Sequence, residues 1–121
     1  MRDLLLSSII LVCIDIIYLN TISNYFNNQI KEIQGSDLEL NMLSTVLAYI
    51  FIAGGLYYFI IKDNRSVKDA FILGLVIYMI YELTNKGIIK NWKWKTVLID
   101  GVWGGILFGL TTYIYKKIKS K

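Results

Sequence analysis

The sequence predicts an all-α integral membrane protein, a single domain over residues 1–121 in which four transmembrane helices form one bundle. Hydrophobic residues make up 55% of the chain and its mean hydropathy is +0.51, whereas soluble domains are about 45–50% apolar. Apolar segments alternate with polar connections, and most approach the roughly 20 residues that a helix needs to cross a bilayer. The four predicted spans cover about residues 4–22, 42–61, 67–85 and 96–115.

The first span, residues 4–22, contains one charged residue, Asp15. The segment that follows, residues 23–41, is polar, and we expect it to connect two spans outside the hydrocarbon core. It is long enough for a partial amphipathic turn around Ile30 and Ile33 on the membrane surface. The residues available to cap the next helix are Ser36, Asp37 and Asn41.

The second span, residues 42–61, carries no charge, and Gly54 and Gly55 lie within it. The missing side chains predict that another helix approaches closely at this point. Aromatic residues near the end of the span, Tyr57 to Phe59, are typical of a membrane interface.

The third span, residues 67–85, is short in apolar length. Ser66 and Asp69, just at its start, resemble a capping box with Asp in place of Glu. An apolar stretch of about 14 residues also fits a buried core helix, but the flanking spans and the tyrosine-rich end favour a crossing. The loop of residues 86–95 combines Trp and Lys, a composition typical of a membrane boundary.

The fourth span, residues 96–115, carries a stripe of glycines. Gly101, Gly105 and Gly109 recur every four residues, so they lie on one face of the helix. We interpret this face as a packing surface that lets two helix backbones approach closely. The alternative is that Gly is simply more frequent in membrane helices than in soluble ones.

The distribution of positive charge predicts the orientation. Four spans place both termini and the turn at residues 62–66 on one side, which then holds eight of the 13 Lys and Arg residues. The positive-inside rule therefore predicts that both termini are cytoplasmic. The lipid bilayer, with its anionic headgroups, is the partner expected for the net charge of +4, and no nucleic acid partner is predicted.

Besides Asp69 at the start of the third span, three carboxylates lie within the predicted spans: Asp15, Glu82 and Asp100. A rise of about 1.5 Å per residue places all three in the half of the bundle away from the termini. Because an ionisable group at such a depth is expensive to insert, it usually marks a functional site, and we expect the three to share one. The neighbours expected in that site are Tyr81, Thr84, Asn85 and Trp103.

The pattern Ile-Asp-x-x-aromatic occurs twice, once at Asp15 and Tyr18 and again at Asp100 and Trp103. The pattern is compatible with an internal repeat of the kind found in many transporters. It is also compatible with coincidence, because the rest of the two segments does not align well.

Three chemical roles are open for the carboxylates. They accept hydrogen bonds that fix the packing, they carry protons in a low dielectric, or they form a hard-cation site together with Thr84 and Asn85. The absence of His and the single Cys argue against the usual zinc sites. The identity of any metal, and of any cofactor, stays open.

The motifs resemble those of a known family. Tyr81 to Asn85, then Lys90 to Trp92, then Asp100 with Trp103 and Gly104 are similar to an uncharacterised family of small four-helix membrane proteins, domain of unknown function 2177. The resemblance covers nearly the whole chain and implies four spans and a membrane location, but no activity. This chain departs from the family pattern in having Glu82 in place of Asp and Tyr18 in place of Trp.

The sequence favours a small membrane protein, forming a homo-oligomer, whose acidic site binds or moves protons or cations. The alternative is a membrane assembly or interaction subunit in which the carboxylates are structural. A lipid-acting enzyme ranks last, because the sequence contains no His, no nucleophile–base pair and no nucleotide-binding loop.

Overall fold

The computed structural model describes residues 2–36 and 41–120, and the regular structure in these ranges is entirely helical. The prediction of an all-α fold is confirmed. The elements are α1 (Arg2–Gln34), α2 (Met42–Leu56), α3 (Val67–Ile88) and α4 (Trp94–Lys119), with a π-helical turn, η1 (Tyr57–Ile61), continuing directly from α2.

Three of these helices are long and apolar enough to cross a membrane: α1, α2 together with η1, and α4. α3 is not among them, because its apolar centre is flanked by charged residues toward both ends. These are Lys68 and Asp69 on one side and Glu82 and Lys86 on the other. The prediction that α3 is also a span stays a prediction.

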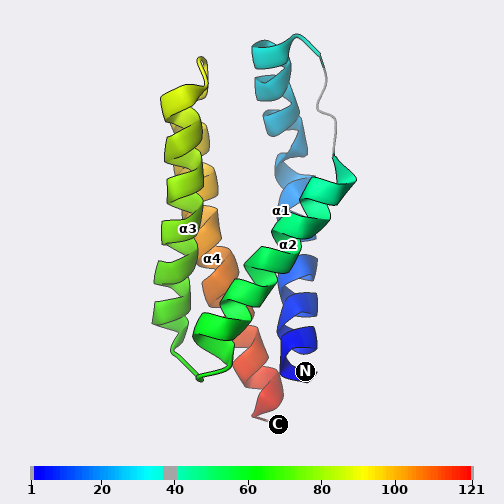
Figure 1. Cartoon of the computed structure of the whole chain (residues 1–121), viewed down its shortest axis with the longest axis vertical. Coiled ribbons are helices and arrows are strands. Elements are labelled where there is room, and N and C mark those ends of the chain that lie inside the picture. Colours follow the sequence, from blue (N-terminus) through cyan, green and yellow to red (C-terminus); the bar gives the residue numbers. More distant parts are fainter. Residues whose placement is uncertain (1, 37–40, 121) are drawn as a thin grey trace.

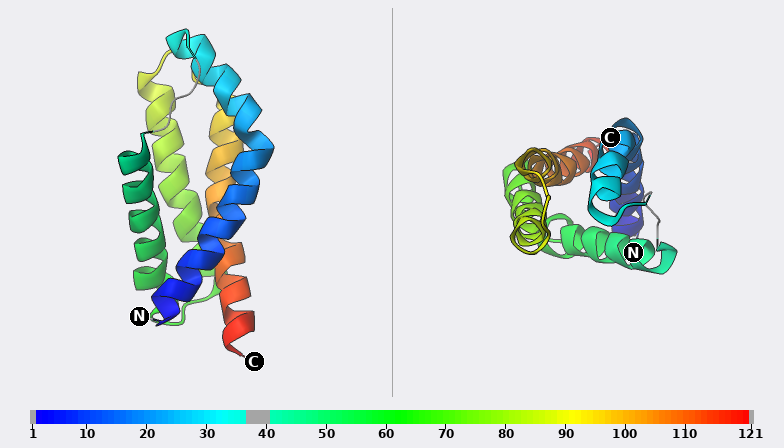
Figure 2. Two further views of the ribbon diagram at one scale, coloured as in Figure 1. Left: turned by 90° about the vertical axis from the view of Figure 1, so that its right-hand side faces the viewer. Right: turned by 90° about the horizontal axis from the view of Figure 1, so that it is seen from above.

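The helices run alternately up and down, so both termini lie at the same end of the molecule (Figure 1). Viewed along the long axis, the four helices surround a central region (Figure 2). α2 begins part-way along α1 and crosses toward the end with the termini (Figure 1). The apolar core includes Leu11, Leu56, Leu107 and Phe108, all almost completely buried.

α1 is longer than the predicted span. Ile30 and Ile33 are part of α1, which continues without a break to Gln34, and the expectation that this turn lies on the membrane surface stays a prediction. The segment from residue 23 contains no Pro or Gly before Gly35. Gly35 adopts φ +80° and ends the helix, as glycine commonly does just after a helix C-terminus.

Two of the predicted helix caps are present. The Asn41 side chain accepts a hydrogen bond from the Ser44 N–H at 3.0 Å, and the Ser66 hydroxyl accepts one from the Asp69 N–H at 3.0 Å. The Asp69 carboxylate pairs with Arg65 at 2.9 Å. Of the other residues considered for the first cap, Asp37 lies outside the described residues.

α3 and α4 form the most extensive contact between helices, and glycines lie along it. A Cβ added at Gly74 would overlap the carbonyl of Gly104. One added at Gly101 would lie 2.5 Å from the Met79 sulfur, and one added at Gly105 would lie 3.0 Å from the Phe71 ring. The two backbones can therefore approach this closely only because side chains are missing.

Gly54 and Gly55 differ from these glycines. A Cβ added at either residue would meet nothing within 4 Å. The expectation that another helix approaches at this point is therefore wrong for the described residues of this chain, because α2 presents these glycines away from α1, α3 and α4.

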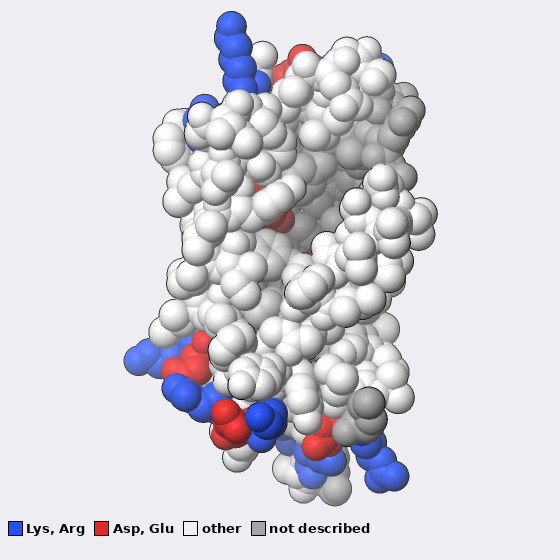
Figure 3. Space-filling view, viewed as in Figure 1, with Lys and Arg blue, Asp and Glu red and all other residues white. Residues whose placement is uncertain are grey.

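Charged side chains gather at the end that carries the termini (Figure 3). Lys119 pairs with Asp3 at 2.9 Å, and the Lys116 ammonium donates to the Asn64 side chain at 2.7 Å. The hydrogen bond from Lys119 lowers the pKa of Asp3. These contacts join the first turn of α1, the turn before α3 and the last turn of α4.

Candidate functional site

Three carboxylates from three helices are buried in the interior. Asp15 lies on α1, Glu82 on α3 and Asp100 on α4, and their exposed fractions are 6%, 1% and 9%. A buried carboxylate requires hydrogen-bond donors or charge partners. None of the ion pairs between described residues includes any of the three, so the donors decide what each carboxylate can do.

Asp15 is satisfied at both oxygens. The Trp103 indole N–H of α4 donates to Oδ1 at 2.9 Å, and the Tyr49 hydroxyl of α2 donates to Oδ2. Asp15 therefore connects three helices through two aromatic donors. This arrangement is the one expected of a carboxylate that holds a bundle together.

Asp100 accepts a hydrogen bond from a tyrosine that stacks on Trp103. The Tyr18 hydroxyl of α1 donates to its Oδ1 at 3.1 Å. The Tyr18 ring stacks on the Trp103 ring with 4.3 Å between centroids and 5° between planes. This stacked pair therefore links the Asp15 and Asp100 carboxylates, the former through Trp103 and the latter through Tyr18.

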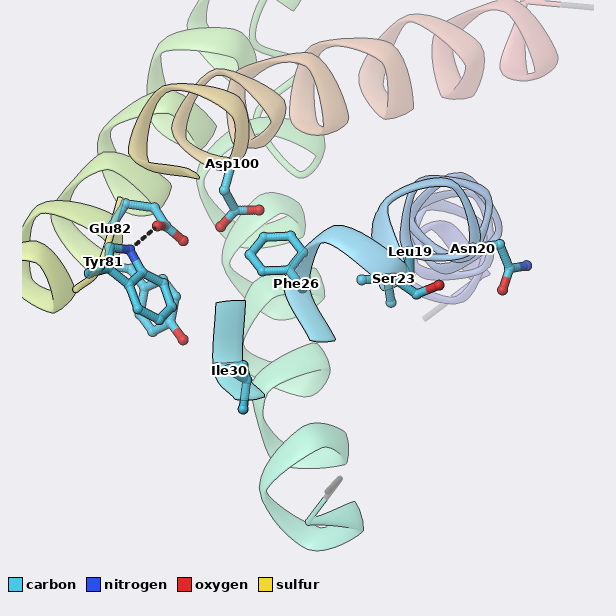
Figure 4. A pocket seen from close by; sticks show the side chains of 9 residues that line it. Leu19, Asn20, Ser23, Phe26, Ile30, Tyr81, Glu82 and Asp100 are labelled. Atoms are coloured by element: carbon cyan, nitrogen blue, oxygen red, sulfur yellow. Dashed lines mark hydrogen bonds between the residues drawn. The ribbon is translucent and has the colours of Figure 1, made fainter. Parts of the chain in front are cut away.

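Glu82 has one satisfied oxygen and one unsatisfied oxygen. The Trp92 indole N–H donates to Oε1 at 2.9 Å, but Oε2 has no donor. The Asp100 carboxyl lines the same cavity as Glu82, and Figure 4 shows the two carboxyl groups turned toward each other. Two carboxylates can form a hydrogen bond with each other only when a proton lies between them.

A second polar cluster fastens the far end of α1 to the start of α4. The buried Gln29 carbonyl oxygen accepts from the Thr96 hydroxyl at 2.7 Å and from the Lys93 backbone N–H at 3.1 Å. The Tyr25 hydroxyl is hydrogen-bonded to the Thr96 hydroxyl at 2.8 Å. Because α4 has no side-chain cap of its own, Gln29 supplies an acceptor there from another helix.

A cavity of about 420 Å³ opens between α1 and the pair α3–α4. Glu82 and Asp100 lie at its inner end, and the rest of its lining is mostly apolar (Figure 4). Figure 3 shows a hollow on this side of the bundle with acidic side-chain atoms inside it. The other lining residues are Leu19, Asn20, Ser23, Phe26, Ile30, Tyr81 and Trp92.

A second cavity, of about 320 Å³, lies on the side of α2. Asp100 and Tyr81 line both cavities. Tyr81 is 59% exposed, so it lies at the surface rather than within the core. The Asp100 carboxylate can therefore be approached from two sides of the bundle.

Apart from Tyr81, which lies at the surface, the predicted site residues divide into two groups. Asp15, Glu82, Asp100 and Trp103 lie in the interior and are linked as described above. Thr84 is exposed and Asn85 is half-buried, and neither side chain takes part in the hydrogen bonds of the interior. The expectation that both join the carboxylates is therefore wrong, because Thr84 and Asn85 lie in the turn of α3 that extends past the buried Glu82.

The hard-cation site expected from three carboxylates is not formed in the part of the chain that is described. No group of three or more His, Cys, Asp or Glu residues is placed there to hold a metal ion. The physical reason is that Trp103 and Tyr49 occupy both oxygens of Asp15, which leaves Glu82 and Asp100 as a pair.

The profile of a family described as "Predicted membrane protein (DUF2177)" matches residues 3–115. The chain belongs to this family. It is therefore a membrane protein, as its sequence motifs suggested, and the match includes every residue of the acidic interior. The family description assigns no activity. Comparisons with curated proteins and with solved structures found no match.

Sequence reasoning for this DUF2177 chain missed several residues of the interior. Tyr49 lies in an apolar span and nothing in the sequence distinguishes it from an interfacial tyrosine. The sequence indicates Trp92 as a boundary residue and as part of the family motif, but not as a donor to Glu82, although its spacing of ten residues suits a return across a tight loop. Gln29 was missed because the segment containing it was expected to lie outside the bundle.

Proposed function

We propose that this membrane protein binds a proton between Glu82 and Asp100, within the predicted membrane region. The observation that supports the proposal is the unsatisfied Oε2 of Glu82, a residue that is 1% exposed and whose carboxyl faces that of Asp100 in the same cavity (Figure 4). Neighbouring carboxylates resist ionising together, and one proton shared between them relieves both repulsion and desolvation.

A proton suits this pair better than a metal ion does. Calcium takes six to eight oxygen ligands and magnesium requires a near-octahedral set, at about 2.0–2.6 Å. The pair offers few free oxygens, since Trp92 and Tyr18 each occupy one. A shared proton needs only two oxygens, one as donor and one as acceptor.

The surroundings of the pair supply no compensating positive charge among the described contacts. The pair's described hydrogen-bond donors are the Tyr18 hydroxyl and the Trp92 indole. No Lys or Arg is among the residues that line the two cavities at the pair. The proton itself therefore removes one of the two negative charges of the pair.

Movement of the proton is a second part of the proposal. Because Asp100 and Tyr81 line cavities on two sides of the bundle, the pair could exchange its proton with either cavity. We propose four spans with both termini cytoplasmic, and a homo-oligomer, because four helices enclose little volume for a pathway of their own.

A second candidate is an assembly subunit in which the carboxylates are structural. Two observations favour it. Both oxygens of Asp15 accept hydrogen bonds from aromatic side chains, and a Cβ added at Gly54 or Gly55 would meet nothing within 4 Å, so the surface of α2 there is open. In this case the glycine face of α2 would contact another membrane helix, and neutral isosteres of the acids would be tolerated.

Infrared spectroscopy of the purified protein in lipid nanodiscs tests proton binding. We expect a carboxylic-acid band at neutral pH that Glu82→Gln removes and that exposed-site Glu32→Gln leaves in place. Proton and cation flux into liposomes then tests movement. A wild-type spectrum without a protonated carboxyl at neutral pH would contradict the proposal, and unchanged flux after Glu82→Gln would remove its transport part.

A further inference from the structure

The cavity at the Glu82–Asp100 pair has the character of a site for an amphiphile. Its wall is formed by apolar and aromatic side chains, including Leu19, Phe26 and Ile30 of α1 and Trp92 of the loop before α4. Its inner end carries the two carboxyls (Figure 4). A largely apolar pocket of about 300–1,000 Å³ with a few convergent polar groups is the usual form of a small-molecule site.

The unsatisfied Oε2 of Glu82 indicates the chemistry of a ligand that would bind in this cavity. Glu82 is 1% exposed, lines the cavity and has no donor for Oε2. Asp100 adds a second acidic group at the same end. A ligand that completes this site must donate hydrogen bonds, and a positive charge on the donor would strengthen them.

We infer that this cavity binds an amphiphilic primary amine, with its ammonium group between Glu82 and Asp100 and its apolar body along α1. An ammonium offers three N–H donors, enough for Glu82 Oε2 and an Asp100 oxygen. The apolar body replaces lipid or water against Leu19, Phe26 and Ile30. Lateral entry from the bilayer suits the exposed positions of Leu19 and Tyr81 at the cavity.

This inference rests on the proposed role of the pair, because the ammonium takes the place of the shared proton. When the ammonium enters, the proton leaves to the buffer, so the net charge of the site is unchanged. Binding of one amine therefore releases one proton. The O–H bond of the protonated carboxyl breaks, its proton goes to a buffer base, and the ammonium is held by hydrogen bonds to the two carboxylates.

The test is calorimetric titration of the full chain in nanodiscs of zwitterionic lipid, with three probes that share a decyl chain. The probes are decylammonium, decyltrimethylammonium and decanol, and empty nanodiscs measure their partitioning into lipid. We expect decylammonium to bind about tenfold more tightly than decanol, the difference that a charge-assisted hydrogen bond supplies. Decyltrimethylammonium, which has charge but no N–H donor, should bind less tightly than decylammonium.

Matched variants locate the site. Glu82→Gln should reduce decylammonium to the affinity of decanol, whereas Glu32→Gln, which removes an exposed carboxylate of α1, should retain the preference. Ser23→Phe places a ring in the cavity away from the carboxyls and should weaken all three probes alike. Thermal unfolding of each variant in the same lipid shows whether the fold is retained.

Two outcomes overturn the inference: equal binding of decanol and decylammonium to the wild type, or a preference that Glu82→Gln leaves intact. If the infrared band of a shared proton is present and the amine preference is absent, the inference fails and proton binding stands. If the amine preference is present and the wild type shows no protonated carboxyl, proton binding fails and the cavity is a cation site.

Discussion

Tyr18 and Trp103 stack face to face, and each donates a hydrogen bond to the carboxylate that belongs to the other's motif. Tyr18 of α1 binds Asp100 of α4, and Trp103 of α4 binds Asp15 of α1. The two Ile-Asp-x-x-aromatic motifs therefore interlock across antiparallel helices. Whether or not the motifs derive from a repeat, their spacing of three residues is what lets each helix supply one donor and one acceptor.

The crossed hydrogen bonds of Tyr18 and Trp103 predict that substitutions at the two residues have coupled effects on stability. Trp103→Phe and Tyr18→Phe should each destabilise the protein by about 0.6–2 kcal/mol, because each leaves a buried carboxylate oxygen without its donor. The double variant should deviate from additivity, since the two rings are in contact. Thermal unfolding in detergent measures this, with Trp94→Phe at an exposed position as the control. If the single variants have negligible effects on stability and the double variant is simply their sum, the stacked pair is not structurally important.

The α3–α4 contact predicts a sharp difference between glycines. Gly74→Ala should destabilise the protein by about 1–3 kcal/mol, because the new methyl group meets the backbone carbonyl of Gly104, which cannot rotate away. Gly54→Ala, which meets nothing within 4 Å, should be neutral or slightly stabilising. Unfolding temperatures in the same detergent provide the comparison, and equal effects of the two substitutions would contradict the packing described.

The hydrogen bonds that Gln29 accepts at the start of α4 predict a local effect on the stability of that helix end. Gln29→Ala removes the acceptor for the Lys93 N–H and the Thr96 hydroxyl. The free energy needed to open the first turn of α4 should therefore fall by about 1 kcal/mol. Hydrogen exchange of the amides at residues 93–96 should accelerate while exchange in the middle of α4 is unchanged. Asn28→Ala, at an exposed neighbouring position, is the control. Uniform acceleration along the whole helix would indicate global rather than local loosening.

The proposed topology predicts which side of the membrane each loop faces. Cysteines introduced at Asn28 and Lys90 should react with an impermeant reagent only from outside, and one at Asn64 only from inside. The native Cys13 is replaced by Ser beforehand, since it is exposed on α1. Labelling of positions 64 and 90 from the same side would eliminate the crossing by α3.

The pair between Asp3 and Lys119 predicts a pH dependence with a definite sign. Lys119 lowers the pKa of Asp3 in the folded state, so the pair stabilises the fold above the unfolded pKa of about 3.9. That contribution is lost as the pH falls through the lower, folded value. The stability difference between wild type and Asp3→Asn should be small, as for exposed ion pairs, and should shrink on acidification. A difference that grows at acid pH would contradict the assignment.

Much of the fold follows from sequence because bilayer physics is restrictive. Apolar length predicted the helices. Ser66 predicted where α3 begins, and Asn41 was one of three candidates for the cap of α2. The extension of α1 to Gln34 could not be predicted in this way. Its polar residues indicate a connection when considered alone, and only the contacts of Gln29 and Tyr25 with Thr96 explain why the helix continues.

The acidic interior was partly predictable for a similar reason. The expense of burying charge indicated Asp15, Glu82 and Asp100 as residues that need partners. The partners themselves are aromatic N–H and O–H groups, and these are abundant at membrane interfaces for unrelated reasons. Nothing in one sequence separates Trp92 and Tyr49, which bind carboxylates, from Trp94, which is exposed.

The marginal composition of α3 has a consequence for biogenesis. A helix with Asp69 near its start and Glu82 near its end partitions poorly into lipid by itself, yet α3 packs so closely on α4 that a Cβ at Gly74 would overlap the Gly104 carbonyl. The insertion machinery would therefore release the two helices together, as a hairpin, rather than one after the other. A chain truncated before Trp94 should leave α3 accessible to protease on the side where its synthesis began, and the full chain should protect it.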